Sequence, residues 1–205
     1  MPEITTYTGG IAVTNGHLLR LPGGTVLVDA PDGIAPWLKG LGVHVDALFL
    51  THQHFDHVLD ATAVKAQHGC PIYAFAALSR DLTLERLYGA VTGSSFEVPE
   101  FEVDHLLEGQ ASIDALGETW QLHHVPGHSP DSVCFYLESF GLLFGGDVLF
   151  LDGVGRTDFP GGSTQQLLSG IQEKLFKLPD STRVFTGHGD DTTIGRERME
   201  NPFLT

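Results

Sequence analysis

Cysteine is scarce in this chain of 205 residues, in which Cys70 and Cys134 are the only two. Two cysteines are too few for a framework of disulfides, so the fold must depend on a hydrophobic core. Cys134 lies in the apolar run Val133–Leu137, which predicts a buried free thiol. A chain of this length can bury a sizeable core, and we expect one domain over residues 1–205.

Positive charge is also scarce, because 11 Lys and Arg residues face 26 Asp and Glu residues and leave a formal net charge of -15. Binding to nucleic acid depends on Lys and Arg contacts to phosphate, so we expect no nucleic-acid partner. The negative charge is typical of a solvated, soluble surface, and bound divalent cations would offset part of it locally.

Long hydrophobic runs are absent as well. No stretch of 18 apolar residues occurs, and the first residues lack a basic region followed by an apolar run. We therefore expect no membrane partner and no signal peptide, and a cytoplasmic protein. The sequence carries no signal for an oligomeric state.

Glycine, in contrast, is abundant, with 25 residues that predict many tight turns. The hydrophobic patterns predict strands at Ile4–Tyr7, Ile11–Leu21, Thr25–Asp29, Val45–Leu50, Pro71–Ala74, Ser112–Leu116, Thr119–Val125, Ser132–Leu137, Leu142–Phe144 and Arg183–Thr186. They predict helices at Ala35–Leu41, Leu59–His68, Ala76–Leu87, Thr164–Leu178 (capped by Ser163) and Thr193–Met199, and a loop over Gly89–Asp104. This order favours a mixed α/β (α+β) fold of two sheets packed face to face with helices outside.

The densest group of metal-ligand side chains follows the strand Val45–Leu50. His52, His54, Asp56 and His57 lie within six positions at the point where this strand ends. Imidazole nitrogens and a carboxylate suit zinc, iron and similar divalent metals. The spacing H-x-H-x-D-H therefore predicts a metal site.

Three more strands each end in one residue of the same kind. His128 follows the strand Thr119–Val125, Asp147 follows Leu142–Phe144, and His188 follows Arg183–Thr186. Each has a glycine beside it, where backbone must pass close to something else. Together with the first cluster, they predict one site assembled from several strand ends.

These seven residues resemble the ligand set of the metallo-β-lactamase superfamily, whose fold is a four-layer αββα sandwich. The resemblance implies one metal on His52, His54 and His128. It implies a second metal on Asp56, His57 and His188, with Asp147 as the bridge. The implied cofactor is therefore two divalent ions, zinc before iron or manganese.

Two further stretches, Gly155–Ser163 and Thr193–Phe203, resemble small bacterial glyoxalase II-like proteins. The resemblance implies a thioesterase that acts on S-(2-hydroxyacyl)glutathione or a similar small-molecule thiol ester by attack of a metal-bound hydroxide. Asp56 would also orient or shuttle the proton of the attacking water. Only 17 residues follow His188, so we expect no C-terminal helical glutathione-binding domain.

Four other residues are candidates for contacts around the metal ligands or with substrate. His124 occupies a position that the family often fills with histidine, and it can either support a ligand or pack as a strand residue. Asp29, at the end of an early strand, is a second candidate for support. Arg156 and Asp158 can form a salt bridge that fixes a loop near Asp147, or Arg156 can meet a substrate carboxylate.

Two other activities stay open. Persulfide dioxygenases are similar over much of the chain, and that resemblance implies a single iron on His52, His128 and Asp147 with oxygen chemistry in place of hydrolysis. A lactonase shares the full ligand set. A true β-lactamase is disfavoured, because an aspartate bridge such as Asp147 is not typical of those enzymes.

Overall fold

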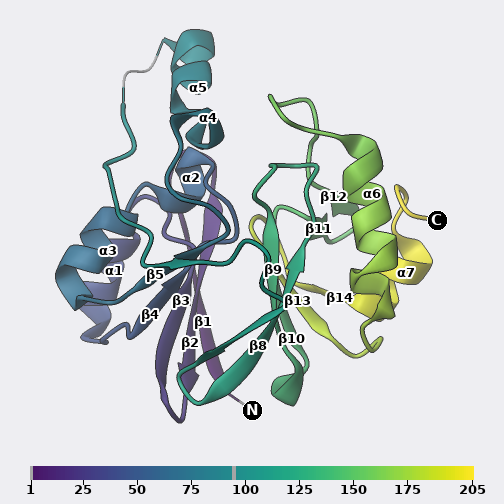
Figure 1. Ribbon diagram of the computed structural model, residues 1–205, viewed down its shortest axis with the longest axis horizontal. Coiled ribbons are helices and arrows are strands. Elements are labelled where there is room, and N and C mark those ends of the chain that lie inside the picture. The colour runs from purple at the N-terminus through teal and green to yellow at the C-terminus, as the bar shows by residue number, and fades with distance from the viewer. Residues whose placement is uncertain (1, 94–95) are drawn as a thin grey trace.

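Two sheets lie face to face between outer helices in the computed structural model, which describes residues 2–93 and 96–205 (Figure 1). The first sheet has six strands whose order in space equals their order in the chain. They are β1 (Glu3–Gly9), β2 (Thr14–Leu21), β3 (Gly24–Val28), β4 (Ala47–Phe49), β5 (Ile72–Ala74) and β6 (His105–Leu106). The pairs from β3 to β6 are parallel, so β3 and β4 end at the same edge.

The second sheet also has six strands. In spatial order they are β14 (Thr192–Thr193), β13 (Arg183–Thr186), β10 (Leu142–Gly146), β9 (Val133–Leu137), β8 (Glu118–His124) and β7 (Ser112–Ala115). Strand β9 is antiparallel to both β8 and β10, and β10 is parallel to β13. It follows that β8, β10 and β13 all end at one edge. A separate small pair consists of β11 (Leu149–Phe150) and β12 (Gly153–Val154).

Helices cover the outer face of each sheet (Figure 1). Helices α1 (Ile34–Leu41) and α3 (Ala61–His68) cover the first sheet, and α6 (Thr164–Glu173) and α7 (Ile194–Glu200) cover the second. The remaining helical segments are α2 (Phe55–Val58), α4 (Arg80–Thr83), α5 (Glu85–Thr92) and the 3-10 turns η1 (Glu138–Phe140) and η2 (Leu175–Lys177).

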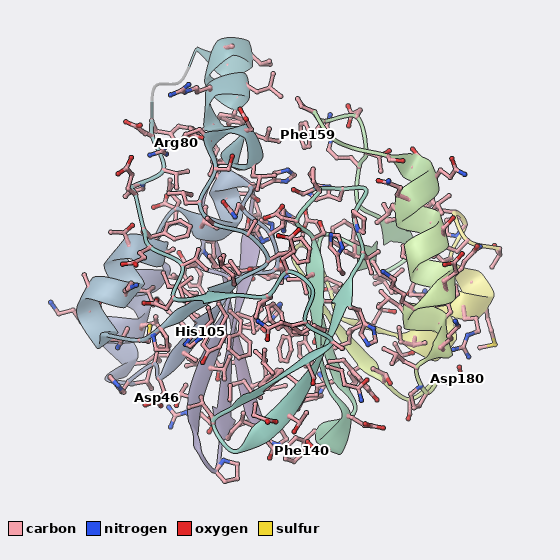
Figure 2. The ribbon with its side chains drawn as sticks, in the orientation of Figure 1. Asp46, Arg80, His105, Phe140, Phe159 and Asp180 are labelled. Atoms are coloured by element: carbon pink, nitrogen blue, oxygen red, sulfur yellow. The ribbon has the colours of Figure 1, made fainter. Side chains whose placement is uncertain are left out.

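Three hydrophobic clusters fill the three spaces between these four layers. The first joins Ile34 and Val64 of the helices to Leu48 of the first sheet. The second lies between the sheets around Phe49 and Phe135, and the third joins the second sheet to α6 and α7. Each sheet thus buries both faces, and the expected αββα sandwich is confirmed. Phe140, in η1, and Phe159, in the loop before α6, lie toward opposite ends of the molecule (Figure 2).

The helix expected at Ala76–Leu87 is wrong. The carbonyls of Ala76 and Ala77 accept hydrogen bonds from Gln53 Nε2, at 3.0 and 3.1 Å, so they do not begin a helix. Instead Ser79 caps α4, and Leu84, with a φ of 59°, separates α4 from α5. Helix α5 then runs to Thr92, into the segment expected to be a loop; residues 94 and 95 of that loop lie outside the described residues.

Smaller differences concern the ends of elements. Strand β2 begins at Thr14 rather than Ile11, and the helix expected over Thr164–Leu178 ends at Glu173 before a 3-10 turn. Helix α2 and the two-residue strands β6, β11, β12 and β14 were not expected, because segments so short carry no readable period. Cys134 is a fully buried free thiol, as expected. Among the described residues, none of the helices has the length and apolar content needed to cross a membrane.

We predict that Phe49→Ala destabilises the fold strongly. Phe49 is fully buried between the sheets, with its ring centroid 4.9 Å from that of Phe135 and 5.0 Å from that of Trp120. Loss of a buried phenyl ring costs about 3–5 kcal/mol of unfolding free energy. Urea denaturation followed by circular dichroism measures the change. Leu41→Ala, at an exposed site, is the control, and an equal effect of both substitutions would contradict the assignment of the core.

Candidate metal centre

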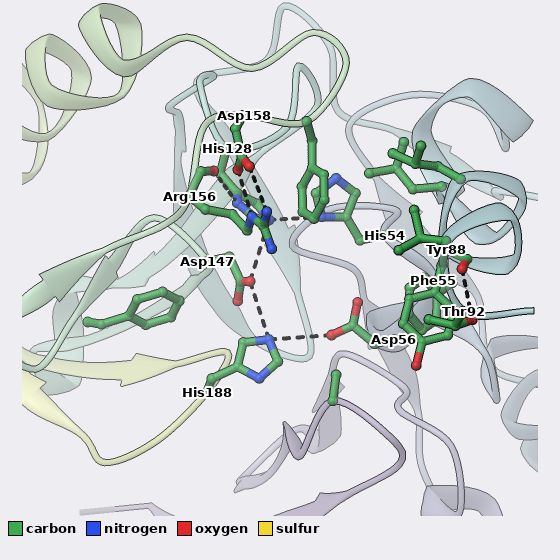
Figure 3. Close-up of a pocket in the computed structure, with 16 residues that line it drawn as sticks. His54, Phe55, Asp56, Tyr88, Thr92, His128, Asp147, Arg156, Asp158 and His188 are labelled. Atoms are coloured by element: carbon green, nitrogen blue, oxygen red, sulfur yellow. Dashed lines mark hydrogen bonds and ion pairs between the residues drawn. The ribbon is translucent and has the colours of Figure 1, made fainter.

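The strand ends described above bring all seven predicted ligand residues to one end of the molecule. His52 and His54 follow β4, and α2 carries Asp56 and His57 in the next turn. From the second sheet, β8, β10 and β13 lead into the turns of His128, Asp147 and His188. Figure 3 shows the side chains of the second sheet facing those of the first across a common space.

Three overlapping groups of side chains offer atoms close enough to share a cation. His52, His54 and His128 form one, Asp56, His57 and His188 another, and His52, His57 and Asp147 a third, each with ligand atoms within 4.8 Å of one another. The first two groups are those implied by the resemblance.

Asp147 lies between these two groups. Its Oδ2 is 3.4 Å from Nε2 of His128 and 3.3 Å from Nε2 of His188. Its Oδ1 is 3.4 Å from Nε2 of His57. The carboxylate therefore faces both groups at once, as a bridging ligand must.

Glycine permits the close approach of the turns. A Cβ atom at Gly187 would overlap the Asp147 carboxylate, and one at Gly146 would overlap the Thr51 side chain. Backbone bonds then join the sheets: the Asn15 amide donates to the Gly187 carbonyl at 2.8 Å, and the Val133 amide donates to the Thr51 carbonyl at 2.9 Å. The glycines expected beside the ligands thus serve as close-packing positions.

Three of the imidazoles have a hydrogen-bond partner on the side away from the cluster. His57 Nδ1 donates to Asp29 Oδ2 at 2.9 Å, which leaves its Nε2 without a proton in the neutral ring. The Thr51 hydroxyl donates to the same Asp29 oxygen at 2.8 Å, so its own oxygen is free to accept from His52 Nδ1 at 3.1 Å. His128 Nδ1 donates to the Arg156 carbonyl at 2.8 Å.

The resulting arrangement fits a cation better than it fits hydrogen bonding. Nε2 of His52 and Nε2 of His128 lie 3.1 and 2.8 Å from Nδ1 of His54, so unprotonated nitrogens face the same atom. Buried Nε2 of His57 and Oδ1 of Asp147 make no hydrogen bond within the described structure. Buried lone pairs without a donor are costly, and divalent cations would satisfy them all.

The pKa values divide the histidines into two sets: His52 and His54 are neutral, whereas, against the effect of burial, neighbouring carboxylates raise the pKa of His57 and His188. Burial and the neighbouring imidazoles hold the pKa of His52 well below its usual range and that of His54 at about 3, so both rings are neutral ligands. Although burial opposes it, the carboxylates of Asp147 and Asp56 raise the pKa of His188 to about 10. In this cluster the negative charge attracts protons, and bound cations would displace them.

A pocket of about 760 Å³ opens over the cluster. Residues of both groups line it, including His54, Asp56, His128, Asp147 and His188. A small molecule can therefore reach the same atoms that face the metal positions.

The four supporting candidates fall in different places. Asp29 contacts the ligand His57 and is fully buried. His124 lies outside the pocket lining: its Nε2 donates to the Pro130 carbonyl at 2.8 Å and its ring stacks on Phe75. Arg156 and Asp158 form a two-pronged ion pair at 2.7 and 2.6 Å on the pocket wall.

Sequence reasoning missed two groups that hold ligands in place. Thr14 Oγ1 donates to Asp56 Oδ2 at 2.7 Å from a strand 42 residues away, and no sequence signal linked the two. Thr51 was not among the candidates, yet its hydroxyl connects His52 to Asp29.

Comparison with known proteins shows the family of this chain. The family model described as the metallo-beta-lactamase superfamily matches residues 9–188, so the chain belongs to that superfamily. A probable metallo-hydrolase of Bacillus subtilis, YqgX, is 37% identical over 83% of this chain and 81% of its own. The hydroxyacylglutathione hydrolase GloC of Haemophilus influenzae is 35% identical over 82% of this chain and 79% of its own. The chain is thus a metallo-hydrolase of this superfamily.

Solved structures give the same fold and a dinuclear site. BLEG-1, described as a B3 metallo-beta-lactamase, superposes with a TM-score of 0.86 at 35% identity, over 99% of this chain and 100% of its own. TTHA1623 in a di-iron-bound form superposes with a TM-score of 0.83 at 32% identity, over 98% of this chain and 100% of its own. The superfamily, the clustered ligands and the second of these structures support a site for two metals.

We predict that Asp29→Asn weakens metal binding about 10–100-fold. The amide oxygen can still accept from the Thr51 backbone, but the amide nitrogen can accept from neither the Thr51 hydroxyl nor His57. Competition with a chromophoric chelator measures the affinity. The control is Asp46→Asn, a half-exposed carboxylate before β4. Wild-type affinity in Asp29→Asn would show that the tautomer of His57 does not depend on Asp29.

A second prediction concerns Thr14. Thr14→Val keeps the shape of the buried side chain but removes its donor to Asp56, so the group of Asp56, His57 and His188 should bind its cation about tenfold more weakly. Thr14→Ser keeps the hydroxyl and should bind like the wild type. Titration calorimetry with two equivalents of metal separates the two affinities, and identical curves for the two variants would refute the role of the hydroxyl.

Proposed function

We propose that this chain is a thioesterase that hydrolyses S-(2-hydroxyacyl)glutathione or a similar thiol ester with two divalent cations. The observation that carries the proposal is the position of Asp147 between two groups of metal-ligand atoms at the floor of an open pocket. The name of the relative GloC supports the class of substrate.

His52, His54 and His128 would hold one cation, and Asp56, His57 and His188 the other, with Asp147 shared. When bound, two such cations would supply a water of near-neutral pKa and would polarise a carbonyl oxygen. We propose zinc, for which nitrogen and carboxylate ligands are suited, and iron is the alternative because TTHA1623 carries two irons.

Asp56 is the proposed catalytic carboxylate. Its side chain is 14% exposed and lines the pocket, so it can meet an attacking water. Although burial alone would raise it, the charge of His57 and hydrogen bonds from His188 and Thr14 hold its pKa at about 2. Asp56 is therefore ionised at neutral pH and can orient the water and accept its proton.

The departing thiol needs no acid from the protein, because a thiolate is a good leaving group near neutral pH. Hydrolysis adds water across the C–S bond and yields a carboxylic acid and a free thiol. Seven converging ligand residues, rather than three, favour this two-metal reaction over oxygen chemistry at a single iron.

The test is release of free thiol from S-lactoylglutathione and from simple thioesters by the zinc-loaded and iron-loaded protein. Asp56→Asn should lower kcat about 10²–10⁴-fold. Asp180→Asn, which alters an exposed carboxylate paired with Arg198, should leave kcat unchanged. Opening of a β-lactam ring, or oxygen consumption with a persulfide, in a protein that releases thiol from none of these thioesters would contradict the proposal.

A further inference from the structure

The pocket over the metal centre has two unlike walls. Figure 3 shows Arg156 and Asp158 on one side and Phe55, Tyr88 and Thr92 on the other. The second wall comes from α2 and from the α4–α5 segment, which stands beyond the ends of the sheets in Figure 1. The metal centre lies between the two walls, so a substrate that reaches it must lie along both.

The wall formed by α5 is apolar. Leu87, Tyr88 and Val91 lie at the spacing i, i+1 and i+4 on one side of α5, and all three line the pocket together with Leu84, which caps the helix. Leu87 is 40% exposed and Val91 is 78% exposed. Exposed apolar side chains gathered at the mouth of an active-site pocket are typical of a ligand-binding surface.

Away from the metal centre, the described lining of the pocket offers little positive charge to an anionic group. Among the described lining residues, Arg156 is the only Lys or Arg, and both prongs of its guanidinium already bind Asp158, at 2.7 and 2.6 Å. Its guanidinium carbon also lies 4.3 Å from the Phe159 ring centroid. Asp158 therefore offsets the positive charge that Arg156 could offer a substrate carboxylate, and the net charge of the whole chain is -15.

We infer that the α5 wall binds an uncharged apolar group of the thioester. Of the thiol esters proposed above, the enzyme would then prefer those with an alkyl or aryl group and an uncharged thiol part to those of glutathione, whose thiol part carries two carboxylates. This inference rests on the proposed function, because it places the reacting C–S bond at the metal centre. The apolar group can belong to the acyl or to the thiol side of the ester; both present the same chemistry to Leu87 and Val91.

The first experiment compares kcat/KM along a series of thioesters. Acyl chains from acetyl to octanoyl are joined either to N-acetylcysteamine, which is uncharged, or to glutathione, and alkyl thiols carrying an acetyl group form a third arm. In the series whose growing chain lies against α5, kcat/KM should rise about fourfold for each added methylene that the wall covers. Each glutathione ester should react about tenfold more slowly than its uncharged counterpart, and the reverse order would overturn the inference.

Substitution of Leu87 tests the wall itself. Leu87→Asn should lower kcat/KM for the longest reactive ester about tenfold more than it lowers kcat/KM for the acetyl ester of N-acetylcysteamine. Leu41→Asn is the matched control, since Leu41 lies on α1, outside the pocket lining, and is 47% exposed. Equal effects of the two substitutions, or a uniform loss with all esters in Leu87→Asn, would contradict a selective apolar wall.

Binding of unreactive thioethers separates this inference from the proposed function. Calorimetry should give a lower Kd for S-hexyl-N-acetylcysteamine than for S-methyl-N-acetylcysteamine, and Leu87→Asn should remove the difference. That result in a protein that hydrolyses no thioester would sustain the apolar site while refuting the proposed reaction. Hydrolysis of thioesters with no preference for either thioether would refute the apolar site alone.

A dimer that Leu87→Asn converts to a monomer, measured by light scattering, would assign the wall to a second copy and overturn the inference.

Discussion

One buried carboxylate, that of Asp29, links the elements on which the metal centre depends. It accepts hydrogen bonds from the backbone and side chain of Thr51, at the end of β4, and from His57 in α2. Its own backbone has a φ of 62°, a conformation that few residues other than glycine adopt readily. The surrounding contacts hold this conformation, and it turns the carboxylate toward the two segments that carry the first ligands.

Hydrogen bonds of this kind set the direction of the imidazole lone pairs. Asp29, Thr51 and the Arg156 carbonyl take the outward protons of three rings, so the inward nitrogens are free to bind metal. The carboxylates of Asp56 and Asp147 lie among them, with Asp56 held by Thr14 of β2. A cluster so buried and so rich in acceptors is stabilised by cations, which couples metal binding to the packing of the two sheets.

The sequence predicted the layers and the seven converging residues well, because strands that end in histidine, aspartate and glycine carry local signals. It could not predict the contacts of Thr14 and Asp29, which depend on how distant segments pack. It also placed a helix over Ala76–Leu87, where the backbone instead turns at Leu84. That error hid the apolar face of α5, since Val91 fell in an expected loop. His124, a candidate for support of the metal ligands, stacks on Phe75 instead, a contact between the two sheets that no local pattern reveals.

Metal content per chain, determined by inductively coupled plasma mass spectrometry after dialysis without chelator, tests the central claim most directly. The structure predicts two equivalents in the wild type and one in His188→Ala, which removes a ligand of only one of the two groups. A single equivalent in the wild type, unchanged after incubation with excess zinc or iron, would contradict a two-metal centre and the hydrolytic mechanism built on it.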